Sequence, residues 1–410
     1  MSFTIEKDFA LLLGAIAAAA HVLGLISAVS AIFRARSPQG AIAWSLSLIF
    51  LPYVSLPLYW ILGRDRFVGY VLARRNKNFE VEYLGKQVQL RSPEFSVSSD
   101  LKHPSFTVFE AIAQMPCTMG NAVDLLVDGT ATFDAIFESI QKAKDYILVQ
   151  FFIVRDDEVG TRLKDLLVER ARAGVRVYFL YDAVGSKGLP RRYCQDLVEA
   201  GAQIEGFRTT RGIKTGFQIN FRNHRKIVVV DGLVAFAGGL NVGDEYLGKD
   251  VFFGHWRDTH VQVQGPVVQA VQLAFLEDWY WSTSAIPKFN WKLLPAPKKN
   301  QKAIIIPTGP ADKLDNCSLL FLEAIQSATE KVWIASPYFV PNVEILAALQ
   351  LAVLRGVDVR ILLPAKIDHR IVYLASFCYL PSTIPYGIKI YRYDPTAFLH
   401  QKVMVIDEDL

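Results

Sequence analysis

The chain has few cysteines and almost no net charge, and each shortage excludes a class of protein. Cys117, Cys194, Cys317 and Cys378 are scattered through 410 residues without a C-x-x-C pair. Neither a disulfide framework nor a zinc site is therefore indicated. Lysine and arginine total 44 against 40 acidic residues, a net charge of +4, which argues against a strongly basic nucleic-acid-binding domain.

Charge is also missing from two long stretches near the N-terminus. No residue from Phe9 to Phe33 carries a formal charge, apart from any protonation of His21, and Ala41 to Leu62 is a second uncharged apolar stretch. At ~1.5 Å per residue, each stretch is long enough to cross a hydrocarbon core as a helix. A cleaved signal peptide fits poorly, because the leading Glu6-Lys7-Asp8 is not basic and a second span follows at once. The sequence predicts a two-helix transmembrane hairpin.

The second span contains Pro52 and Pro57, which membrane helices tolerate. With two spans, the N-terminus and the rest of the chain lie on the same side of the membrane. The flanking basic residues are Arg34 and Arg36 in the turn, and Arg64, Arg66, Arg74, Arg75 and Lys77 after the second span. The positive-inside rule then puts the large domain in the cytoplasm, by a modest margin because the turn is basic too. We assign residues 1–79 to this multi-pass hairpin and its basic juxtamembrane segment.

Histidine is scarce, with seven residues, yet two histidines open copies of one pattern. His224–Asp231 and His400–Asp407 both read H-x-K-x-x-x-x-D and run through β-branched, apolar residues, as a buried strand does. Residues two apart on a strand face the same way, so His224 projects beside Lys226, and His400 beside Lys402. Asp231 and Asp407 complete the motifs, but lie at an odd spacing from their histidines. We expect them at strand ends, entering turns.

A histidine beside a lysine pairs a nucleophile with an anion clamp, which suits attack on a phosphate diester. The lysines would neutralise the non-bridging oxygens and stabilise charge in the transition state. One histidine would attack phosphorus and form a phosphohistidine, while the other protonates the leaving alkoxide and deprotonates the incoming alcohol. Because the lysines supply the positive charge, we expect neither a metal nor a cofactor.

The remainder of the chain reads as an α/β protein in two similar halves. Residues 146–181 predict a strand, a helix and a strand, and residues 331–364 repeat this order. The order implies largely parallel sheets covered by helices. One half supplies one histidine and one lysine, so the halves must pack together to complete a site. We place the first half at 80–283, a linker at 284–302 and the second half at 303–410.

The paired motif resembles the phospholipase D superfamily, and its context resembles the bacterial cardiolipin synthases within it. The supporting segments are Gly120-Asn121, Tyr181-Asp182, Gly238-Gly239-Leu240-Asn241, His255-Trp256-Arg257-Asp258 and Ser336-Pro337-Tyr338-Phe339. The resemblance covers nearly the whole chain and implies duplicated halves about a pseudo-twofold axis. It also implies that His224 is the nucleophile and His400 the acid and base.

Two supporting residues follow from their places in these segments. Asn241 comes after a glycine pair, and its amide is expected to donate to a phosphate oxygen. Asp258 resembles the family carboxylate that orients the nucleophilic imidazole, as in a catalytic triad. The alternative for Asp258 is a salt bridge with Arg257 or another surface cation.

The resemblance implies transfer of a phosphatidyl group from one phosphatidylglycerol to another, with release of glycerol, at the bacterial inner membrane. Membrane lipid is then the partner, nucleic acid is not, and the oligomeric state stays open. Two alternatives are a membrane-tethered phospholipase D that hydrolyses its substrate, and an inactive membrane scaffold.

The scaffold alternative arises from the last residue, Leu410. The family pattern continues further, with more strands and a second Gly-Ser-x-Asn segment equivalent to residues 238–241. We therefore expect a truncated sequence with an incomplete second half, poorly folded or inactive by itself. Activity equal to that of a version extended to family length would contradict this expectation.

Overall fold

The structure is a computed structural model that describes residues 2–35, 38–63, 93–97, 104–208, 222–309, 312 and 314–408. The chain forms two compact units: an N-terminal unit of residues 1–76 with 208–222, and an α/β unit of residues 77–207 with 223–410. Arg36, the basic run Arg64–Lys77 and the expected continuation after Leu410 lie outside the described residues.

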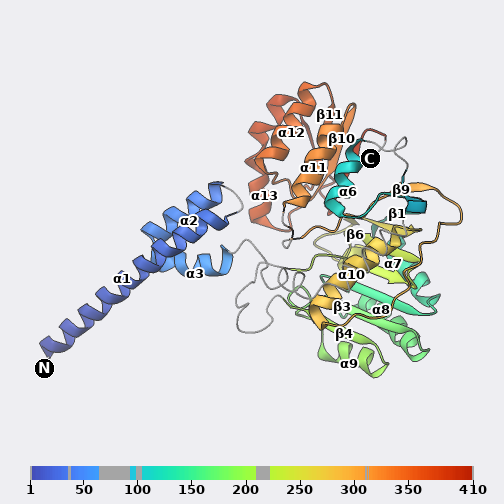
Figure 1. Cartoon of the computed structure of the whole chain (residues 1–410), viewed down its shortest axis with the longest axis horizontal. Helices are drawn as coiled ribbons and strands as arrows, with labels where there is room; N and C mark the ends of the chain where they lie inside the picture. The colour runs from blue at the N-terminus through green and yellow to red at the C-terminus, as the bar shows by residue number, and fades with distance from the viewer. Residues whose placement is uncertain are drawn as a thin grey trace. The chain divides into compact units, whose positions relative to one another are not determined.

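The described part of the N-terminal unit forms three apolar helices, α1 Ser2–Arg34, α2 Pro38–Phe50 and α3 Pro52–Leu62 (Figure 1). Within the described part of the chain, α1 is the one helix long and apolar enough to cross a membrane, over Asp8–Arg34. The prediction of a single second helix was wrong, because the chain breaks at Leu51 and starts α3 at Pro52. Proline has no N–H to continue a helix but suits a first turn, which explains the break.

The first half of the α/β unit is built on an eight-stranded sheet in the order β4-β3-β2-β5-β6-β8-β1-β9. Its strands are β1 Thr118–Val127, β2 Tyr146–Phe151, β3 Arg176–Asp182, β4 Gln203–Phe207, β5 Ile227–Val230, β6 Val234–Gly238, β8 Thr259–Gln264 and β9 Gln301–Ala303. Its helices are α7 Asp128–Gln141, α8 Glu158–Arg172, α9 Arg191–Glu199, the 3₁₀ helix η4 Asp244–Leu247 and α10 Val268–Thr283.

The second half has a four-stranded sheet in the order β12-β11-β10-β14. Its strands are β10 Lys331–Ala335, β11 Asp358–Leu363, β12 Lys389–Arg392 and β14 Val403–Ile406. Its helices are α11 Asn316–Ser327, α12 Val343–Leu354, α13 Arg370–Phe377, and the 3₁₀ helices η5 Leu380–Ser382 and η6 Ile384–Tyr386. A separate parallel pair, β7 Trp256–Arg257 with β13 Phe398–Leu399, joins the two halves.

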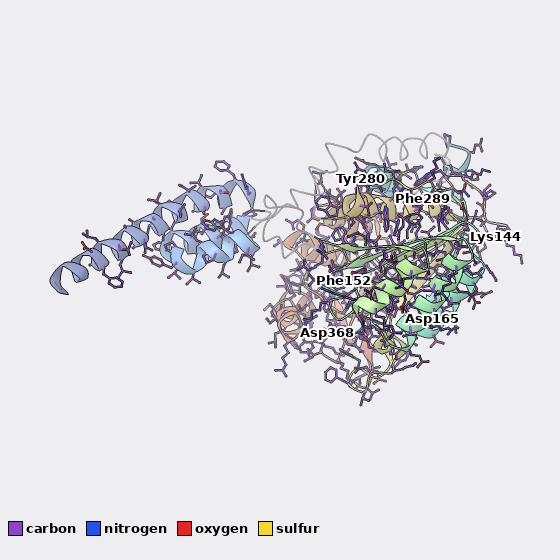
Figure 2. The ribbon with its side chains drawn as sticks, turned by 90° about the horizontal axis from the view of Figure 1, so that it is seen from below. Lys144, Phe152, Asp165, Tyr280, Phe289 and Asp368 are labelled. Carbon is purple, nitrogen blue, oxygen red and sulfur yellow. The ribbon has the colours of Figure 1, made fainter. Side chains whose placement is uncertain are left out.

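The expected duplication is visible in the strand pairing. β2 lies between β3, which is parallel to it, and β5, which is antiparallel. β10 lies in the same way between β11 and β14. Lys144 and Phe152 mark the two ends of β2 in Figure 2. The first sheet is not largely parallel, however: only β2–β3 and β3–β4 are parallel among its described pairs. Short turns such as the one between β5 and β6 can join only antiparallel strands.

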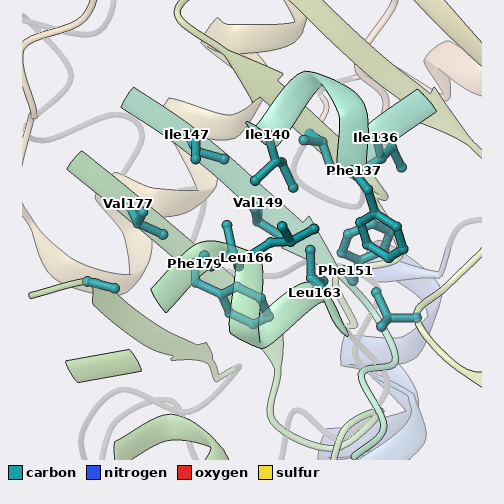
Figure 3. Close-up of a cluster of buried hydrophobic side chains, with 14 of the residues drawn as sticks. Ile136, Phe137, Ile140, Ile147, Val149, Phe151, Leu163, Leu166, Val177 and Phe179 are labelled. Carbon is teal, nitrogen blue, oxygen red and sulfur yellow. The ribbon is translucent and has the colours of Figure 1, made fainter. Parts of the chain in front are cut away.

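Helices cover both faces of the first sheet, which is why β2 is buried along its whole length. On one face, apolar side chains of α7 and α8 pack on alternate residues of β2 and β3 (Figure 3). The labelled members of this core are Ile136, Phe137, Ile140, Ile147, Val149, Phe151, Leu163, Leu166, Val177 and Phe179. On the other face, Tyr178 of β3 meets Trp279 of α10 edge-to-face.

Two segments near the predicted boundaries of the halves pack on the other half or on the first sheet. The 3₁₀ helix η1 Pro93–Phe95 and helix α6 Pro104–Ala113 precede the first sheet. Phe106 and Phe109 of α6 nevertheless join the hydrophobic core of the second half, because α6 packs on α11. The end of the predicted linker forms β9, which pairs with β1. Apolar positions in 104–113 gave no indication of which core would bury them.

Candidate active site

Each motif histidine lies just before its strand, at the edge of its own sheet where the parallel strands end. His224 and Lys226 precede β5, and His400 and Lys402 precede β14. Because β5 runs antiparallel to β2, its first residue Ile227 lies opposite Gln150 near the end of β2. The carboxyl edge of parallel strands is the usual place for ligands in α/β sheets. The sequence placed the histidines inside the strands, and the structure places them in the extended segments that lead into them.

Buried polar side chains fix the first motif segment. The backbone N–H of Asn223 donates to Asp182, at 3.1 Å, and the Asn223 side chain accepts from Gln150, at 2.8 Å. Gln150 also donates to Asp278, which binds Arg225 at 2.8 Å. Gln150 and Asp278 were not singled out from the sequence. The available signal was one glutamine inside the apolar run of β2, where an amide needs a partner.

His224 is held by stacking. Its ring lies on Phe152, with centroids 3.8 Å apart and planes 25° apart. No described residue makes a hydrogen bond to the His224 ring. Burial, with the nearby charges of Lys226 and Lys402, lowers the pKa of His224 to about 4. The imidazole is therefore neutral at pH 7, with a lone pair available for attack.

His400 is held by a carboxylate. Its Nδ1 lies 2.7 Å from Oδ2 of Asp258, which is 0% exposed. The second carboxylate oxygen accepts from the backbone N–H of Thr259 at 2.8 Å. Burial lowers the pKa of His400, and the hydrogen bond to Asp258 opposes that shift. A carboxylate on Nδ1 fixes the tautomer. Nε2, which lies 3.0 Å from the amine of Lys402, is then the nitrogen that can exchange a proton with a substrate.

The partner of Asp258 differs from the predicted one. We expected Asp258 to orient His224, the assigned nucleophile, but it binds His400 of the other half. Pairing of β7 with β13 explains this, since the backbone N–H of His400 donates to the Arg257 carbonyl at 2.9 Å. For the alternative, a salt bridge of Asp258 with Arg257 or another surface cation, the structure shows that the Arg257 guanidinium binds Asp128 at 3.0 Å.

The two lysines occupy matching positions. The amine of Lys226 donates to the His224 carbonyl, and that of Lys402 to the His400 carbonyl, each at 2.7 Å. Burial and the charge of Lys402 lower the pKa of Lys226 to about 7. Burial lowers the pKa of Lys402 to about 8. Such buried cations favour an incoming anion, which would restore their ordinary pKa values.

Asp231 and Asp407 lie away from this cluster, although the sequence grouped them with the catalytic motifs. Asp231 accepts from the backbone N–H groups of Lys144, Asp145 and Tyr146 at 2.8–2.9 Å. Asp407 accepts in the same way from Thr329, Glu330 and Lys331. Figure 2 separates Lys144, on the Asp231 side, from Phe152, on the His224 side. The aspartates therefore fasten the strand ends, where they were expected, and do not face the reacting groups.

The glycine pair Gly238-Gly239 lies against two buried side chains. A Cβ on Gly239 would lie 2.1 Å from Oδ1 of Asp258, and a Cβ on Gly238 would lie 2.5 Å from the His260 ring. The pair therefore makes room for two buried side chains. Asn241, the expected phosphate donor, instead accepts from the backbone N–H of Ile153 and donates to Tyr246, each at 3.1 Å.

Two residues near the site were missed as site residues. His260 is buried beside Gly238, and burial lowers its pKa to about 4. Tyr338 approaches His400 edge-on at 6.4 Å and donates to Asp368, whose charge favours the protonated form of Lys402. Within the described ranges, no three His, Cys, Asp or Glu side chains gather as they would around a metal ion.

Two family models match parts of the chain. The family model described as cardiolipin synthase, PLD-like domain, matches residues 136–279 and 321–410. The model described as phospholipase D-nuclease N-terminal matches residues 22–64.

Among solved structures, phosphatidylserine synthase from Haemophilus influenzae Rd KW20 has a TM-score of 0.51 at 13% identity. The match covers 79% of this chain and 80% of that one, and it shows a common fold alone.

Sequence relatives are closer. Cardiolipin synthase A of Pseudomonas putida strain GB-1 is 48% identical over 98% of this chain and 83% of its own length. Cardiolipin synthase A of Pseudomonas fluorescens strain Pf-5 is 48% identical over 97% of this chain and 83% of its own. The family model and these relatives show that the chain belongs to the cardiolipin synthase family and carries its phospholipase D-like domain.

Proposed function

We propose that this chain is a cardiolipin synthase that transfers a phosphatidyl group from one phosphatidylglycerol to another and releases glycerol. The observation that carries the proposal is the complementary pair of histidines, one neutral and free of hydrogen bonds from described residues, the other bound to a buried carboxylate. Relatives named cardiolipin synthase A support the substrate class.

In the first step, the free nitrogen of His224 attacks phosphorus and a P–N bond forms. The P–O bond to the glycerol headgroup breaks, and the leaving alkoxide takes a proton from His400. Lys226 and Lys402 bind the non-bridging oxygens, where charge accumulates. Asp258 stabilises the protonated His400 that this step requires.

In the second step, the headgroup hydroxyl of another phosphatidylglycerol attacks the phosphohistidine. His400 takes the hydroxyl proton as the P–O bond forms and the P–N bond breaks. The intermediate keeps the phosphodiester bond energy, so no nucleotide is consumed. Rings of Trp256, Phe398 and Tyr338 lie within 5.2–6.4 Å of the His400 ring. This aromatic surround limits water near the base and favours a lipid alcohol as acceptor.

The setting supports a reaction at the bacterial inner membrane. The apolar helix α1 supplies an anchor, and phosphatidylglycerol is itself a membrane lipid. We place the α/β unit on the cytoplasmic side, because basic residues flank the anchor in the sequence.

The test is turnover by the full chain in vesicles containing phosphatidylglycerol. We expect cardiolipin and free glycerol in equal amounts, and neither product from His224→Ala or His400→Ala. Phosphatidic acid without cardiolipin would show hydrolysis instead, and no product from the unaltered chain would contradict the proposal.

A substrate with a good leaving group, phosphatidyl p-nitrophenol, distinguishes the roles of the two histidines. Its departure needs no proton, so His400→Ala should still release nitrophenol in a burst and accumulate a covalent phosphatidyl adduct. His224→Ala should give neither. A burst from His224→Ala would reverse the assignment of nucleophile and acid.

A further inference from the structure

A tight turn in the first half displays two adjacent apolar side chains. Val251 is 99% exposed and Phe252 is 62% exposed. The turn is well braced, because the Asp250 carboxylate accepts from the backbone N–H of Phe252 at 2.8 Å and of Phe253 at 2.9 Å. The Asp250 carbonyl also accepts from Gly254 at 2.8 Å. The fold thus keeps the side chains of Val251 and Phe252 exposed on the protein surface.

This turn adjoins the active site. The ring of Phe253 packs on Trp256 and Phe398, with both centroid distances 5.1 Å. Trp256 and Phe398 in turn contact His400, at 5.2 and 5.9 Å. One layer of aromatic rings therefore separates Val251 and Phe252 from the catalytic imidazole.

The second half contributes a cation beside this turn, and exposed apolar side chains follow that cation in the sequence. The amine of Lys366 lies 5.6 Å from the centroid of the Phe252 ring. Two residues after Asp368 the chain enters α13, where Ile371 is 84% exposed and Leu374 is 63% exposed. A cation among exposed apolar side chains suits an anionic membrane surface better than water.

We propose that Val251, Phe252, Ile371 and Leu374 form a lipid-inserting rim that dips into the bilayer and lets substrate pass to His400. The occupant is a bilayer of anionic phospholipid, argued from the apolar side chains, the accompanying Lys366 and the aromatic contact with the site. The inference rests on the proposed function, since it concerns delivery of the same lipid.

The test compares lipid in bilayers with the same headgroup in solution. Val251→Ser with Phe252→Ser should lower the initial rate on vesicle phosphatidylglycerol about tenfold or more, because apolar contact with the bilayer is lost. The rate on short-chain phosphatidylglycerol below its micelle concentration should be unchanged. Val198→Ser on α9, also exposed at 55%, is the matched control and should alter neither rate.

Equal losses on both substrates would overturn the rim and leave the proposed function intact. If the unaltered chain were inactive on both substrates, the proposed function itself would be overturned. A direct readout is Phe252→benzoylphenylalanine, which should crosslink to phospholipid on illumination, unlike Val198→benzoylphenylalanine. Crosslinks from position 252 only to a second protein chain, or none, would overturn the rim.

An independent observation concerns the path of the N-terminal unit. α2 runs antiparallel to α1 from its C-terminal end: Ser45 donates to the Ala28 carbonyl at 3.4 Å, and Tyr53 meets His21 with centroids 5.5 Å apart. At the break, a Cβ on Gly24 would lie 3.1 Å from Cβ of Pro52. The turn thus lies beside the middle of α1.

α3 then runs back the way α2 came. Tyr59 donates to Ser30 and Trp60 to Ser27, each at 3.4 Å. Trp44 of α2 meets Tyr59 of α3 at 5.3 Å, as expected for neighbouring antiparallel helices. The beginning of α2 and the end of α3 therefore lie at the same end of α1.

The lengths of α2 and α3 agree with a turn between them that lies inside the bilayer. α2 has 13 residues and α3 has 11, or ~20 and ~16 Å at the α-helical rise. A hydrocarbon core measures ~30 Å, so neither helix crosses it. The 27 residues of Asp8–Arg34 in α1 are long enough to cross it.

We infer that α1 crosses the membrane and that α2–α3 is a re-entrant hairpin, so that the N-terminus lies on the side opposite the start of α2 and the end of α3. In a two-span hairpin, the positive-inside rule gives only a modest preference, because the turn between the spans is basic as well. The re-entrant arrangement removes this conflict. In the sequence, Arg34 and Arg36 come between α1 and α2 and the basic run 64–77 follows α3, whereas Glu6, Lys7 and Asp8 come at the start of α1. The positive-inside rule makes the basic side cytoplasmic.

Thiol labelling of spheroplasts decides between the two topologies. Thr4→Cys should react with a membrane-impermeant maleimide in intact spheroplasts, whereas Gln39→Cys should react only after permeabilisation. The native cysteines, all between 117 and 378, give the cytoplasmic baseline in the unaltered chain. A two-span hairpin predicts the opposite pair of results. Equal labelling of both positions, or loss of the N-terminus by cleavage, would also overturn the inference.

Discussion

Lys226 is a buried cation, which lowers the stability of the fold. Its amine is buried, and its pKa in the folded state is about 7 against an ordinary 10.5. Between pH 7 and 10 the unfolded chain binds more protons than the folded one, so stability rises with pH. Below pH 7 the full penalty of a buried cation remains.

Lys226→Met should therefore raise the free energy of unfolding at pH 7, by about 1–3 kcal/mol, while abolishing turnover. The gain should shrink as the pH approaches 10. Denaturant titrations of the full chain in detergent at several pH values measure it. Lys142→Met, in an exposed pair with Glu138, is the control and should change stability little. A gain independent of pH would contradict the electrostatic account.

Gly239 tests the carboxylate that binds His400. Gly239→Ala puts a Cβ at 2.1 Å from Oδ1 of Asp258, which displaces the carboxylate from the imidazole. We expect kcat to fall about 100-fold or more, the range that general acid–base groups contribute. Gly188→Ala, which meets no atom within 4 Å, should leave kcat unchanged. A fully active Gly239→Ala protein would show that the His400–Asp258 contact is dispensable.

At this scale the sequence predicts residue types better than partners. The two His-Lys pairs are evident because the pattern occurs twice. The link between Asp258 and His400 spans 142 positions and depends on the β7–β13 pairing, which no local pattern indicates. The same limit applies to Asn241, whose buried partners come from Ile153 and Tyr246.

Among the elements, the motif strands depend on their terminal aspartates. Burial raises the pKa of Asp407, but hydrogen bonds from the backbone N–H groups of Lys331, Thr329 and Glu330 outweigh it and hold the pKa well below the usual range. A lowered pKa means that the carboxylate stabilises the fold above about pH 4 and loses this effect as the pH falls further.

Asp407→Asn should lower the free energy of unfolding at pH 7 by about 1–3 kcal/mol, because charged acceptors are lost from three backbone N–H groups. The difference from the unaltered chain should narrow below pH 4. Thermal unfolding at pH 7 and pH 3 measures both effects, with the neighbouring exposed Glu408→Gln as control. A constant difference across that range would argue against a carboxylate role.

Element order was predictable, and element ends and directions were less so. Apolar periodicity identified the strand–helix–strand repeats in both halves. It did not show that Pro52 would end one helix and begin another, because membrane helices often accommodate proline, as α3 does at Pro57. The number of parallel pairs was overestimated. β6 follows β5 after a short turn and β8 comes far after β1 in the sequence, yet both pairs are antiparallel.

For the whole molecule, the two lysines predict how activity depends on pH. With pKa values of about 7 for Lys226 and about 8 for Lys402, the free enzyme loses its anion clamp as pH rises. KM for phosphatidylglycerol should increase about tenfold between pH 7 and 9. The bound phosphate raises both pKa values, so kcat should change less. Steady-state rates on vesicles test this, and a constant KM with falling kcat would contradict it.

The contact between Asp258 and His400 also bears on when the enzyme becomes active during synthesis. Translation proceeds from the N-terminus, so the apolar α1 leaves the ribosome long before the 142 positions between the two partners are complete. Until His400 emerges, Asp258 has no imidazole to bind and the first histidine has no acid. On the proposed mechanism, the membrane segment of a nascent chain therefore leaves the ribosome before both histidines of the site are present.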